Sequence, residues 1–271
     1  MGALVVIPAR YGSTRFPGKP LAMLQGKPVI QHVYEQATRA KRADEVVIAT
    51  DDERIIASTA RFGGRAMMTS PTARSGTDRV AEVARARTAA VVVNVQGDEP
   101  LVHAEMIDQL VRFLEAHQAV PMASLMTRWK SADDLNNPNM VKVVVDRDGF
   151  ALYFSRAPIP HVRDPQVRSR LEAQGSRQKP LPPASSLQPP ASYKHLGIYG
   201  YQRPFLLQFP SLEPTPLEQS EQLEQLRALE HGYKIKLLET VHDTIGVDTP
   251  DDLAKVEALL ARSSGTLKVE R

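Results

Sequence analysis

Hydrophobic and polar positions follow two periods up to about residue 117. Short apolar runs of strand length alternate with stretches in which apolar residues recur every three or four positions, as on one face of a helix. The predicted strands cover residues 3–8, 45–50, 66–69 and 90–96. The predicted helices carry apolar faces formed by Val29, Val33 and Ala37, by Ile55, Ile56 and Thr59, and by Val80, Val83 and Ala84. Strands that alternate with helices predict βα units and an α/β fold with a mainly parallel sheet.

The pattern changes at Pro121, where extended segments follow one another with little helix between them. These segments cover residues 121–128, 140–146, 150–156 and 195–202, and we expect a mixed sheet or a hairpin arm. Amphipathic helices return at residues 216–231 and 250–262. Residues 164–192 contain six prolines among polar and charged residues, so we expect a long exposed loop that forms a surface insertion.

The composition excludes several kinds of chemistry. The chain of 271 residues has no cysteine, so it has no disulfide, thiolate metal site or thiol nucleophile. Its 34 basic and 31 acidic residues give a net charge of +3, and no basic tract suits duplex DNA, so we expect no nucleic-acid partner. The N-terminus enters a strand at once, and no apolar stretch approaches the ~20 residues that a membrane span needs. We therefore expect a cytoplasmic protein without a membrane partner.

A loop rich in glycine, proline and cations follows the first predicted strand. Arg10, Arg15 and Lys19 alternate with glycine and proline in residues 8–20, so the backbone can turn sharply while the cations converge. This arrangement favours a polyanionic ligand such as a nucleoside triphosphate. The loop has neither the P-loop spacing nor the G-x-G-x-x-G pattern, so a nucleotide site here is of another kind.

Two more polar loops follow predicted strands, at residues 50–52 and 96–99. Because ligands of open α/β sheets lie beyond the carboxyl ends of the strands, we expect these loops to share one edge with residues 10–19. The loop at 96–99 contains Asp98, which suits a hard cation, since Mg2+ needs few protein carboxylates when water and phosphate oxygens complete its coordination. The alternative is that Asp98 or Glu99 caps a turn before the next helix.

Asp248 is a second candidate ligand. Thr249 and Pro250, followed by two acidic residues, make a good helix start, which explains them without any functional role. Asp248 is not explained in this way. If it faced Asp98, the two carboxylates could hold a cation, but the sequence alone does not establish that approach.

Residues 75–79 also have a structural and a functional interpretation. They begin a predicted helix, with Ser75 or Thr77 as the cap and Asp78 in the first turn. The same segment offers backbone amides, hydroxyls and Arg79 to a base or a phosphate. Capping does not exclude a functional role.

Residues 195–201 alternate like a strand, which places His195 and Tyr199 on one face. A lone histidine in such a position is more often structural. The sequence has no Ser–His–Asp order and no histidine pair with metal-ligand spacing that stands out, so a serine hydrolase or a zinc enzyme has little support.

Nine motifs in this order resemble those of the cytidylyltransferases that activate acidic sugars, especially 3-deoxy-D-manno-octulosonate (Kdo). The motifs cover residues 7–20, 49–51, 75–79, 94–100, 137–142, 151–156, 195–201, 223–227 and 246–250. The chain departs from the family pattern in its long proline-rich stretch and in Asp78, which stands where glutamate is usual.

The resemblance implies a nucleotide-diphospho-sugar transferase fold, which is a Rossmann-like α/β sheet with a smaller mixed β region used for dimerisation. In this single domain, residues 1–120 and 203–262 would form the nucleotide-binding part. Residues 121–202 would form the sugar-binding and dimerisation part, with the insertion at 164–192. The implied reaction transfers CMP from CTP to the anomeric hydroxyl of Kdo and releases pyrophosphate, for lipopolysaccharide biosynthesis. The implied enzyme is a homodimer that uses Mg2+.

The resemblance also implies a role for individual residues. The implied catalytic residues are Arg10, Lys19, Asp98 and Asp248, of which Asp98 and Asp248 would bind the metal ion. The implied nucleotide-binding residues are Pro8, Ala9, Arg10, Arg15, Lys19, Thr50, Asp51, Ser75, Gly76, Arg79 and Gln96. The implied sugar-binding residues are Gln96, Arg156, His195, Tyr199, Glu224 and Gln225.

Three alternatives remain open at this point. A metal-dependent glycosyltransferase would need a D-x-D string at a strand end, which residues 146–148 match, although they precede a glycine at a predicted hairpin turn. A noncatalytic nucleotide-binding module would bind CTP without releasing pyrophosphate. A cytidylyltransferase for sialic acid would share the fold, but the strings that end at Arg156 and begin at His195 disfavour it.

Overall fold

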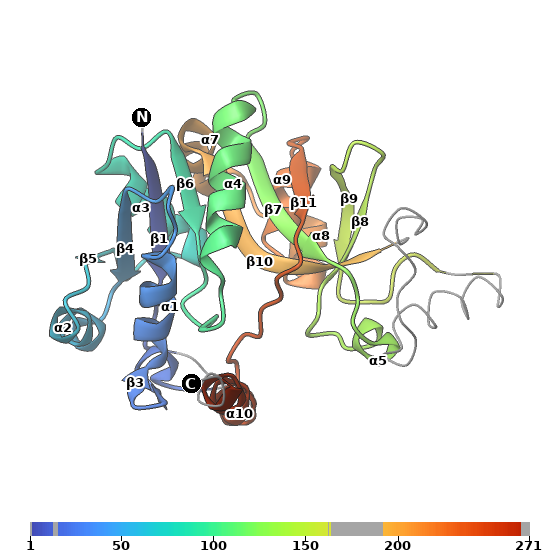
Figure 1. The fold of residues 1–271 in the computed structure, drawn as a ribbon. Coiled ribbons are helices and arrows are strands. Elements are labelled where there is room, and N and C mark those ends of the chain that lie inside the picture. The colour runs from blue at the N-terminus through green and yellow to red at the C-terminus, as the bar shows by residue number, and fades with distance from the viewer. Residues whose placement is uncertain (1, 13–15, 162, 164–191, 267–271) are drawn as a thin grey trace. The chain divides into compact units, whose positions relative to one another are not determined.

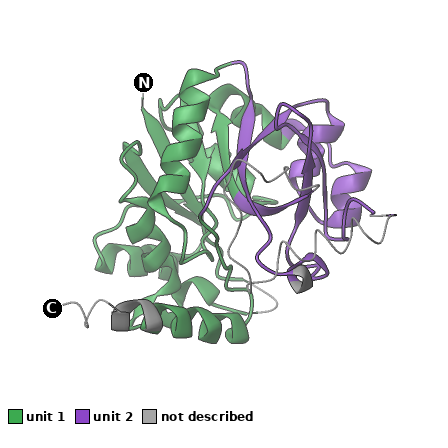
Figure 2. Ribbon diagram, turned by 45° about the vertical axis from the view of Figure 1, so that its right-hand side comes forward, with its two compact units in different colours: residues 1–118, 198–210, 242–271 green, residues 119–197, 211–241 purple. Residues whose placement is uncertain are grey.

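The computed structural model describes residues 2–12, 16–161, 163 and 192–266, with the side chains of residues 132, 133 and 262–266 left out (Figure 1). Arg15 and all but the last residue of the expected insertion at 164–192 lie outside these ranges. The chain forms two compact units (Figure 2). Unit 1 comprises residues 1–118, 198–210 and 242–271, and unit 2 comprises residues 119–197 and 211–241. The bounds of the two units differ from those of the expected nucleotide-binding and sugar-binding parts, since residues 211–241 belong to unit 2, and the function of each part stays a prediction.

The sheet of unit 1 confirms the predicted parallel arrangement. Its strands are β1 (Ala3–Pro8), β4 (Glu45–Thr50), β5 (Ala66–Met68), β6 (Val91–Asn94) and the end of β10 (Tyr193–Gln202), in the order β10-β6-β1-β4-β5. The first four strands run parallel, and β10 pairs with β6 in the antiparallel direction. Val5 lies opposite Val46 and Val93 in the ladder. Every residue of β1 is buried, as a continuous apolar run in a parallel sheet requires.

Unit 1 also contains helices that lie between and after these strands along the chain. They are α1 (Val29–Ala37), α2 (Glu53–Arg61), α3 (Gly76–Arg85), α4 (Ala104–Ala116), α7 (Arg203–Gln208) and α10 (Pro250–Thr266). Short elements precede α1, namely η1 (Lys19–Leu21) and the hairpin of β2 (Met23–Leu24) and β3 (Lys27–Pro28), and η3 (Phe209–Ser211) follows α7. The predicted faces of α1 and α3 are buried. Ser75 caps α3 by accepting a hydrogen bond from the Asp78 amide, which confirms the capping interpretation.

Unit 2 is a mixed β region with short helices. Its strands are β7 (Met122–Thr127), β8 (Lys142–Val145), β9 (Ala151–Ser155), residues 193–197 of β10, and β11 (Ile235–Glu239). β7 lies between β11, which is parallel to it, and β10, and β8 pairs in the antiparallel direction with β9 and β10. Among the described residues of this unit, the helices are α5 (Ala132–Leu135), α8 (Pro216–Glu221) and α9 (Gln225–Glu230).

The expectation of one helix over residues 216–231 is wrong. The chain forms α8 and α9 instead, because Gln222 between them has a φ of 53° and so leaves the right-handed helical conformation. Strand β11 had no counterpart among the predicted elements. No helix in the described residues is long and apolar enough to cross a membrane.

Candidate functional site

Three loops of unit 1 leave the carboxyl ends of neighbouring parallel strands. β1 ends at Pro8, β4 ends at Thr50, and the chain after β6 continues to Gly97. A Cβ atom at Gly97 would lie 2.7 Å from the Pro8 carbonyl oxygen, and one at Gly76 would lie 3.3 Å from Pro8 Cγ. Gly97 and Gly76 therefore both lie close to Pro8. The approach of the loop at Gly97 is possible because this residue has no side chain.

Lys19 joins two of these loops to the segment before α10. Its Nζ atom lies 2.5 Å from Asp98 Oδ2 and 3.1 Å from Asp248 Oδ1. The Lys19 side chain is only 13% exposed, while the two carboxylates remain partly accessible. Three of the four predicted catalytic residues thus meet at one point, including the approach of Asp248 to Asp98 that the sequence could not establish. The fourth, Arg10, is exposed.

The two carboxylates fit the predicted metal role. Both approach a single cationic atom, so their oxygens converge on a position that favours positive charge. Carboxylate oxygens are hard ligands, and Mg2+ is bound by one or two of them when phosphate and water supply the remaining positions. Asp98 and Asp248 would hold Mg2+ once Lys19 turns to another anionic partner.

Arg79 lies in an internal hydrogen-bond network beside this site. Its guanidinium donates to Asp51 Oδ2 at 2.6 Å, to Thr69 Oγ1 at 2.9 Å and to the Ser70 carbonyl at 3.2 Å. Arg79 is buried, and Asp51 neutralises its charge. This network holds the chain after β4 against the first turn of α3, so in this structure Arg79 supports the loop.

The remaining predicted nucleotide residues surround the same edge of the sheet. Pro8, Ala9 and Thr50 are buried, while Ser75 and Gly76 begin α3 and are partly accessible. The Gln96 side chain reaches toward Asn94, with 3.5 Å between Nε2 and Oδ1. Their assignment to nucleotide binding stays a prediction.

Arg156, one of the predicted sugar-binding residues, lies in unit 2 in contact with the end of α8. Its Nε donates to the Glu221 carbonyl at 2.8 Å, and its backbone amide donates to Glu221 Oε2 at 2.9 Å. The remaining guanidinium nitrogens donate to the carbonyls of Pro138 at 3.1 Å and Gln222 at 3.4 Å. A guanidinium has five N–H donors, and these three contacts leave two for a ligand.

His195 is buried in unit 2. Its Nε2 lies 2.9 Å from Ser124 Oγ, and because that hydroxyl donates its only proton to the Leu196 carbonyl, the imidazole is the donor of the pair. The imidazole also contacts the Phe154 ring in an edge-on arrangement, with 4.9 Å between the ring centroids. Burial lowers the pKa of His195 to about 3, so the side chain is neutral at physiological pH.

The other predicted sugar residues divide between the units. Glu224 and Gln225 stand at the start of α9 in unit 2, and the buried Gln225 Nε2 has no hydrogen-bond partner among the described residues. Tyr199 and Gln96 belong to unit 1. Tyr199 lies on β10, with its ring 6.3 Å from that of Tyr201. The assignment of all these residues to sugar binding stays a prediction.

Comparison with known proteins decides the family. The cytidylyltransferase family model matches residues 4–235, which is most of the chain. The chain belongs to the cytidylyltransferase family. A relative named 3-deoxy-manno-octulosonate cytidylyltransferase from Geotalea uraniireducens is 51% identical over 94% of this chain and 98% of its own length. One of the same name from Geobacter metallireducens is 50% identical over 97% of this chain and 99% of its own length.

Solved structures confirm the fold of this cytidylyltransferase. A CMP:2-keto-3-deoxy-manno-octonic acid synthetase complexed with CTP has a TM-score of 0.83 and 41% identity, with 97% of this chain and 100% of the other covered. A putative glucose-1-phosphate thymidylyltransferase from Bacillus anthracis, at 16% identity and a TM-score of 0.62 over 95% of both chains, shares the fold alone. The resemblance and the α/β fold class inferred from the sequence are confirmed, and the protein is a nucleotidyltransferase by family.

Sequence reasoning missed two residues beside Arg156 in this cytidylyltransferase. Lys142 is completely buried, and its Nζ donates to the carbonyls of Asn137 at 2.7 Å and Arg156 at 2.8 Å. Burial lowers the pKa of Lys142, and the nearby Arg156 charge lowers it further. A lysine within an apolar strand was the available signal for this residue. Glu221, which holds Arg156, gave no local signal, because the contact joins residues far apart in the chain.

Proposed function

We propose that this cytidylyltransferase transfers CMP from CTP to the anomeric hydroxyl of Kdo and releases pyrophosphate. The observation that carries the proposal is the meeting of Lys19, Asp98 and Asp248 at the carboxyl edge of the unit 1 sheet. The names of the relatives and the CTP complex of the similar synthetase support both substrates.

The reaction is a displacement at phosphorus. The anomeric oxygen of Kdo forms a bond to the α-phosphorus of CTP, the bond from that phosphorus to the bridging oxygen breaks, and pyrophosphate leaves with the electron pair. The hydroxyl proton passes to solvent. No covalent enzyme intermediate is needed, so the protein contributes positioning and charge neutralisation.

The residues of unit 1 divide this work. Lys19 and Arg10 neutralise the triphosphate and then the departing pyrophosphate, and Arg79 with Asp51 holds the adjoining loop in place. Asp98 and Asp248 would hold Mg2+, which, when bound, would neutralise phosphate oxygens and lower the pKa of the attacking hydroxyl. Lys19 then exchanges its two carboxylate partners for phosphate oxygens.

Arg156 in unit 2 suits the other substrate. A guanidinium can pair with the Kdo carboxylate through two parallel hydrogen bonds, and the free N–H donors of Arg156 permit this pairing. The buried Gln225 amide offers a further donor to a sugar hydroxyl. His195 is neutral, so it contributes a hydrogen bond or packing and no charge.

The proposal extends to assembly and location. Family resemblance supports a homodimer that forms through the mixed β region of unit 2. The use of CTP, a cytoplasmic metabolite, supports action in the cytoplasm. Size-exclusion chromatography with light scattering tests the dimer, and a monomeric mass at micromolar concentration would contradict it.

The deciding experiment measures pyrophosphate release from CTP and Mg2+ with the purified full chain. Parallel reactions contain Kdo, N-acetylneuraminate or no acceptor. We expect release that depends strictly on Kdo and stops when EDTA removes the metal. Release with N-acetylneuraminate alone would indicate a sialic acid enzyme, and CTP binding without release in any reaction would indicate a nucleotide sensor.

A further inference from the structure

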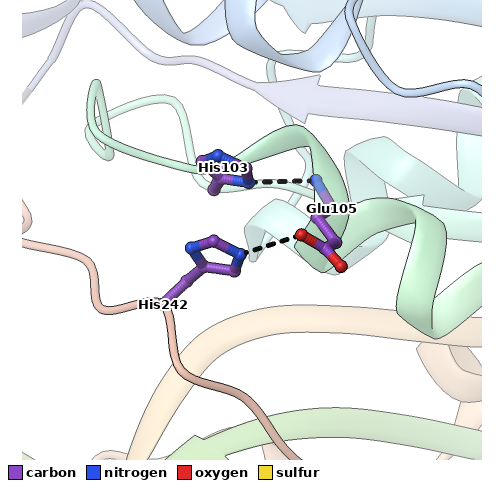
Figure 3. A group of neighbouring side chains, drawn as sticks. All are labelled: His103, Glu105 and His242. Carbon is purple, nitrogen blue, oxygen red and sulfur yellow. Dashed lines mark hydrogen bonds and ion pairs between the residues drawn. The ribbon is translucent and has the colours of Figure 1, made fainter.

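A group of metal-ligating side chains lies in unit 1 apart from Asp98 and Asp248. His103 directly precedes α4, Glu105 belongs to its first turn, and His242 comes from the segment that follows β11 (Figure 3). One ligand atom from each residue lies within 4.8 Å of the others. Among the described residues, no other group of three or more such side chains is this close.

Contacts between the three side chains already bring them together. His242 Nε2 lies 3.2 Å from Glu105 Oε2, and the rings of His103 and His242 stack with centroids 3.8 Å apart and planes 11° from parallel. Figure 3 shows both contacts of Glu105, one through its backbone amide to His103 and one through its carboxylate to His242. Two segments that are distant in the sequence thus bring potential metal-ligand atoms close together.

The donor set selects a class of metal. Two imidazoles and one carboxylate form a borderline-soft set that suits Zn2+ and neighbouring first-row divalent ions, with a fourth position left for water. Asp98 and Asp248, by contrast, provide hard oxygen ligands alone. His103 and Glu105 are exposed and His242 is partly exposed, so an ion can enter from solvent.

One rearrangement is needed before an ion can bind. Imidazole lone pairs lie in the ring plane, so two parallel stacked rings cannot both direct a lone pair at the same ion. His103 Nδ1 accepts from the Glu105 amide at 3.3 Å, so the proton of the neutral ring is on Nε2 and the lone pair that an ion can use is that of Nδ1. Rotation of the His103 ring out of the stack gives up its contact with the Glu105 amide and frees Nδ1 for an ion, and it disturbs no core packing because His103 is exposed.

Electrostatics at the start of α4 both oppose and support a cation. The positive end of the helix dipole disfavours positive charge there. The Glu105 carboxylate lies in the first turn and offsets this effect, and it also contacts His242 directly. A divalent ion bound by all three residues is therefore compensated locally.

We propose that His103, Glu105 and His242 form a Zn2+ site that clips the segment at residues 242–248 to the start of α4. His103 follows Asp98 along the chain, and His242 precedes Asp248, so the clip connects the two segments that carry the carboxylates of the candidate catalytic site. A backbone hydrogen bond also joins these two segments, in which the Val247 amide donates to the Asp98 carbonyl at 2.8 Å. Zn2+ in this site stabilises the approach of the two segments.

The test is Zn2+ titration of the metal-free full chain by calorimetry, without CTP or Mg2+, together with Co2+ titration followed by visible absorption. We expect one tight site and absorption bands typical of nitrogen and oxygen coordination. His242→Ala and His103→Asn should each weaken Zn2+ binding at least about tenfold. Asparagine is a good N-cap, so His103→Asn removes a ligand while it preserves the start of α4.

Two control variants test whether the tight site belongs to these three residues. His117→Ala removes a histidine at the opposite end of α4, whose ring stacks on Phe113 at 4.2 Å, and should bind Zn2+ like the wild type. Asp98→Asn should also keep the tight site. A rise in melting temperature with Zn2+ in the wild type, absent in His242→Ala, would support the clip. Wild-type Zn2+ affinity in both site variants, or loss of the tight site in Asp98→Asn or His117→Ala, would overturn the proposal.

Discussion

The backbone amide of Val247 donates a hydrogen bond to the backbone carbonyl of Asp98, with 2.8 Å between nitrogen and oxygen. Val247 is completely buried in a hydrophobic cluster with Leu24, Val29 and Val256. Asp248 follows directly, so its carboxylate is brought beside Asp98 by a residue that is anchored in the core. A buried apolar side chain and a backbone hydrogen bond thus help to position a segment without helix or strand, together with the contact of Lys19 with Asp248.

Neutralising either carboxylate should greatly lower the catalytic efficiency. Asp98→Asn and Asp248→Asn keep the side-chain shape but remove the charge, and we expect kcat/KM to fall at least about 100-fold, which corresponds to about 2.7 kcal/mol. Pyrophosphate release at saturating Mg2+ measures the effect. Asp251→Asn, an exposed change in the first turn of α10, is the control and should stay active. Wild-type activity of Asp98→Asn would contradict the assignment of Asp98 as a ligand of Mg2+.

Removing the Arg79 guanidinium should destabilise the fold. Arg79→Ala leaves Asp51 and Thr69 without their partner in a network that is largely buried. We expect the free energy of unfolding to fall by about 3 kcal/mol, measured by urea denaturation. Arg85→Ala on the exposed surface of α3 is the matched control and should change it by less than about 0.5 kcal/mol. Equal stability of the two variants would show that the network contributes little.

His195 should make the protein sensitive to acid. Burial lowers the pKa of His195 from 6.5 to about 3, so between these values the unfolded chain binds a proton that the folded protein does not. This contribution to stability is complete above pH 6.5 and is lost as the pH falls, at about 1.4 kcal/mol per pH unit.

The measurement is the free energy of unfolding at several pH values between about 4.5 and 7, for the wild type and for His195→Gln. Glutamine can still donate to Ser124 but does not titrate in this range. We expect the unfolding free energy of the variant to depend less steeply on pH, by an amount that corresponds to about one bound proton. Equal slopes would show that His195 is not buried in the neutral form.

A methyl group at residue 97 should disturb the edge of the sheet. The Cβ atom of Gly97→Ala would lie 2.7 Å from the Pro8 carbonyl oxygen and 3.3 Å from Ile30 Cδ1, so the loop must move away from β1. We expect a loss of about 2 kcal/mol in unfolding free energy and weaker CTP binding by calorimetry. Gly246→Ala, where a Cβ atom meets nothing within 4 Å, controls for stability. Wild-type CTP affinity in Gly97→Ala would mean that this loop does not shape the nucleotide site.

Local patterns predicted much of unit 1. The apolar run at residues 3–8 is a fully buried parallel strand, and the face of Val29, Val33 and Ala37 is buried on α1. The start of α3 was predicted as well, with Ser75 as one of two candidate caps. These features depend on side-chain period and on hydrogen bonds within a few residues, which the order of residues expresses directly. Gln222 interrupts a predicted helix because it has a left-handed conformation. The prediction missed this break, since that conformation left no clear trace in the pattern of residues.

By itself, the sequence determined which residues form most of the strands and helices of unit 1, which loops follow the parallel strands, and, through nine ordered motifs, the family. Only the tertiary structure decided that Lys19 bridges Asp98 and Asp248, that Asp51 neutralises Arg79, and that His103 lies on His242. The physical reason is the range of the interactions. Period and capping act over one or two turns, whereas these contacts join distant segments that meet only after hydrophobic residues such as Val247 have been packed into the core.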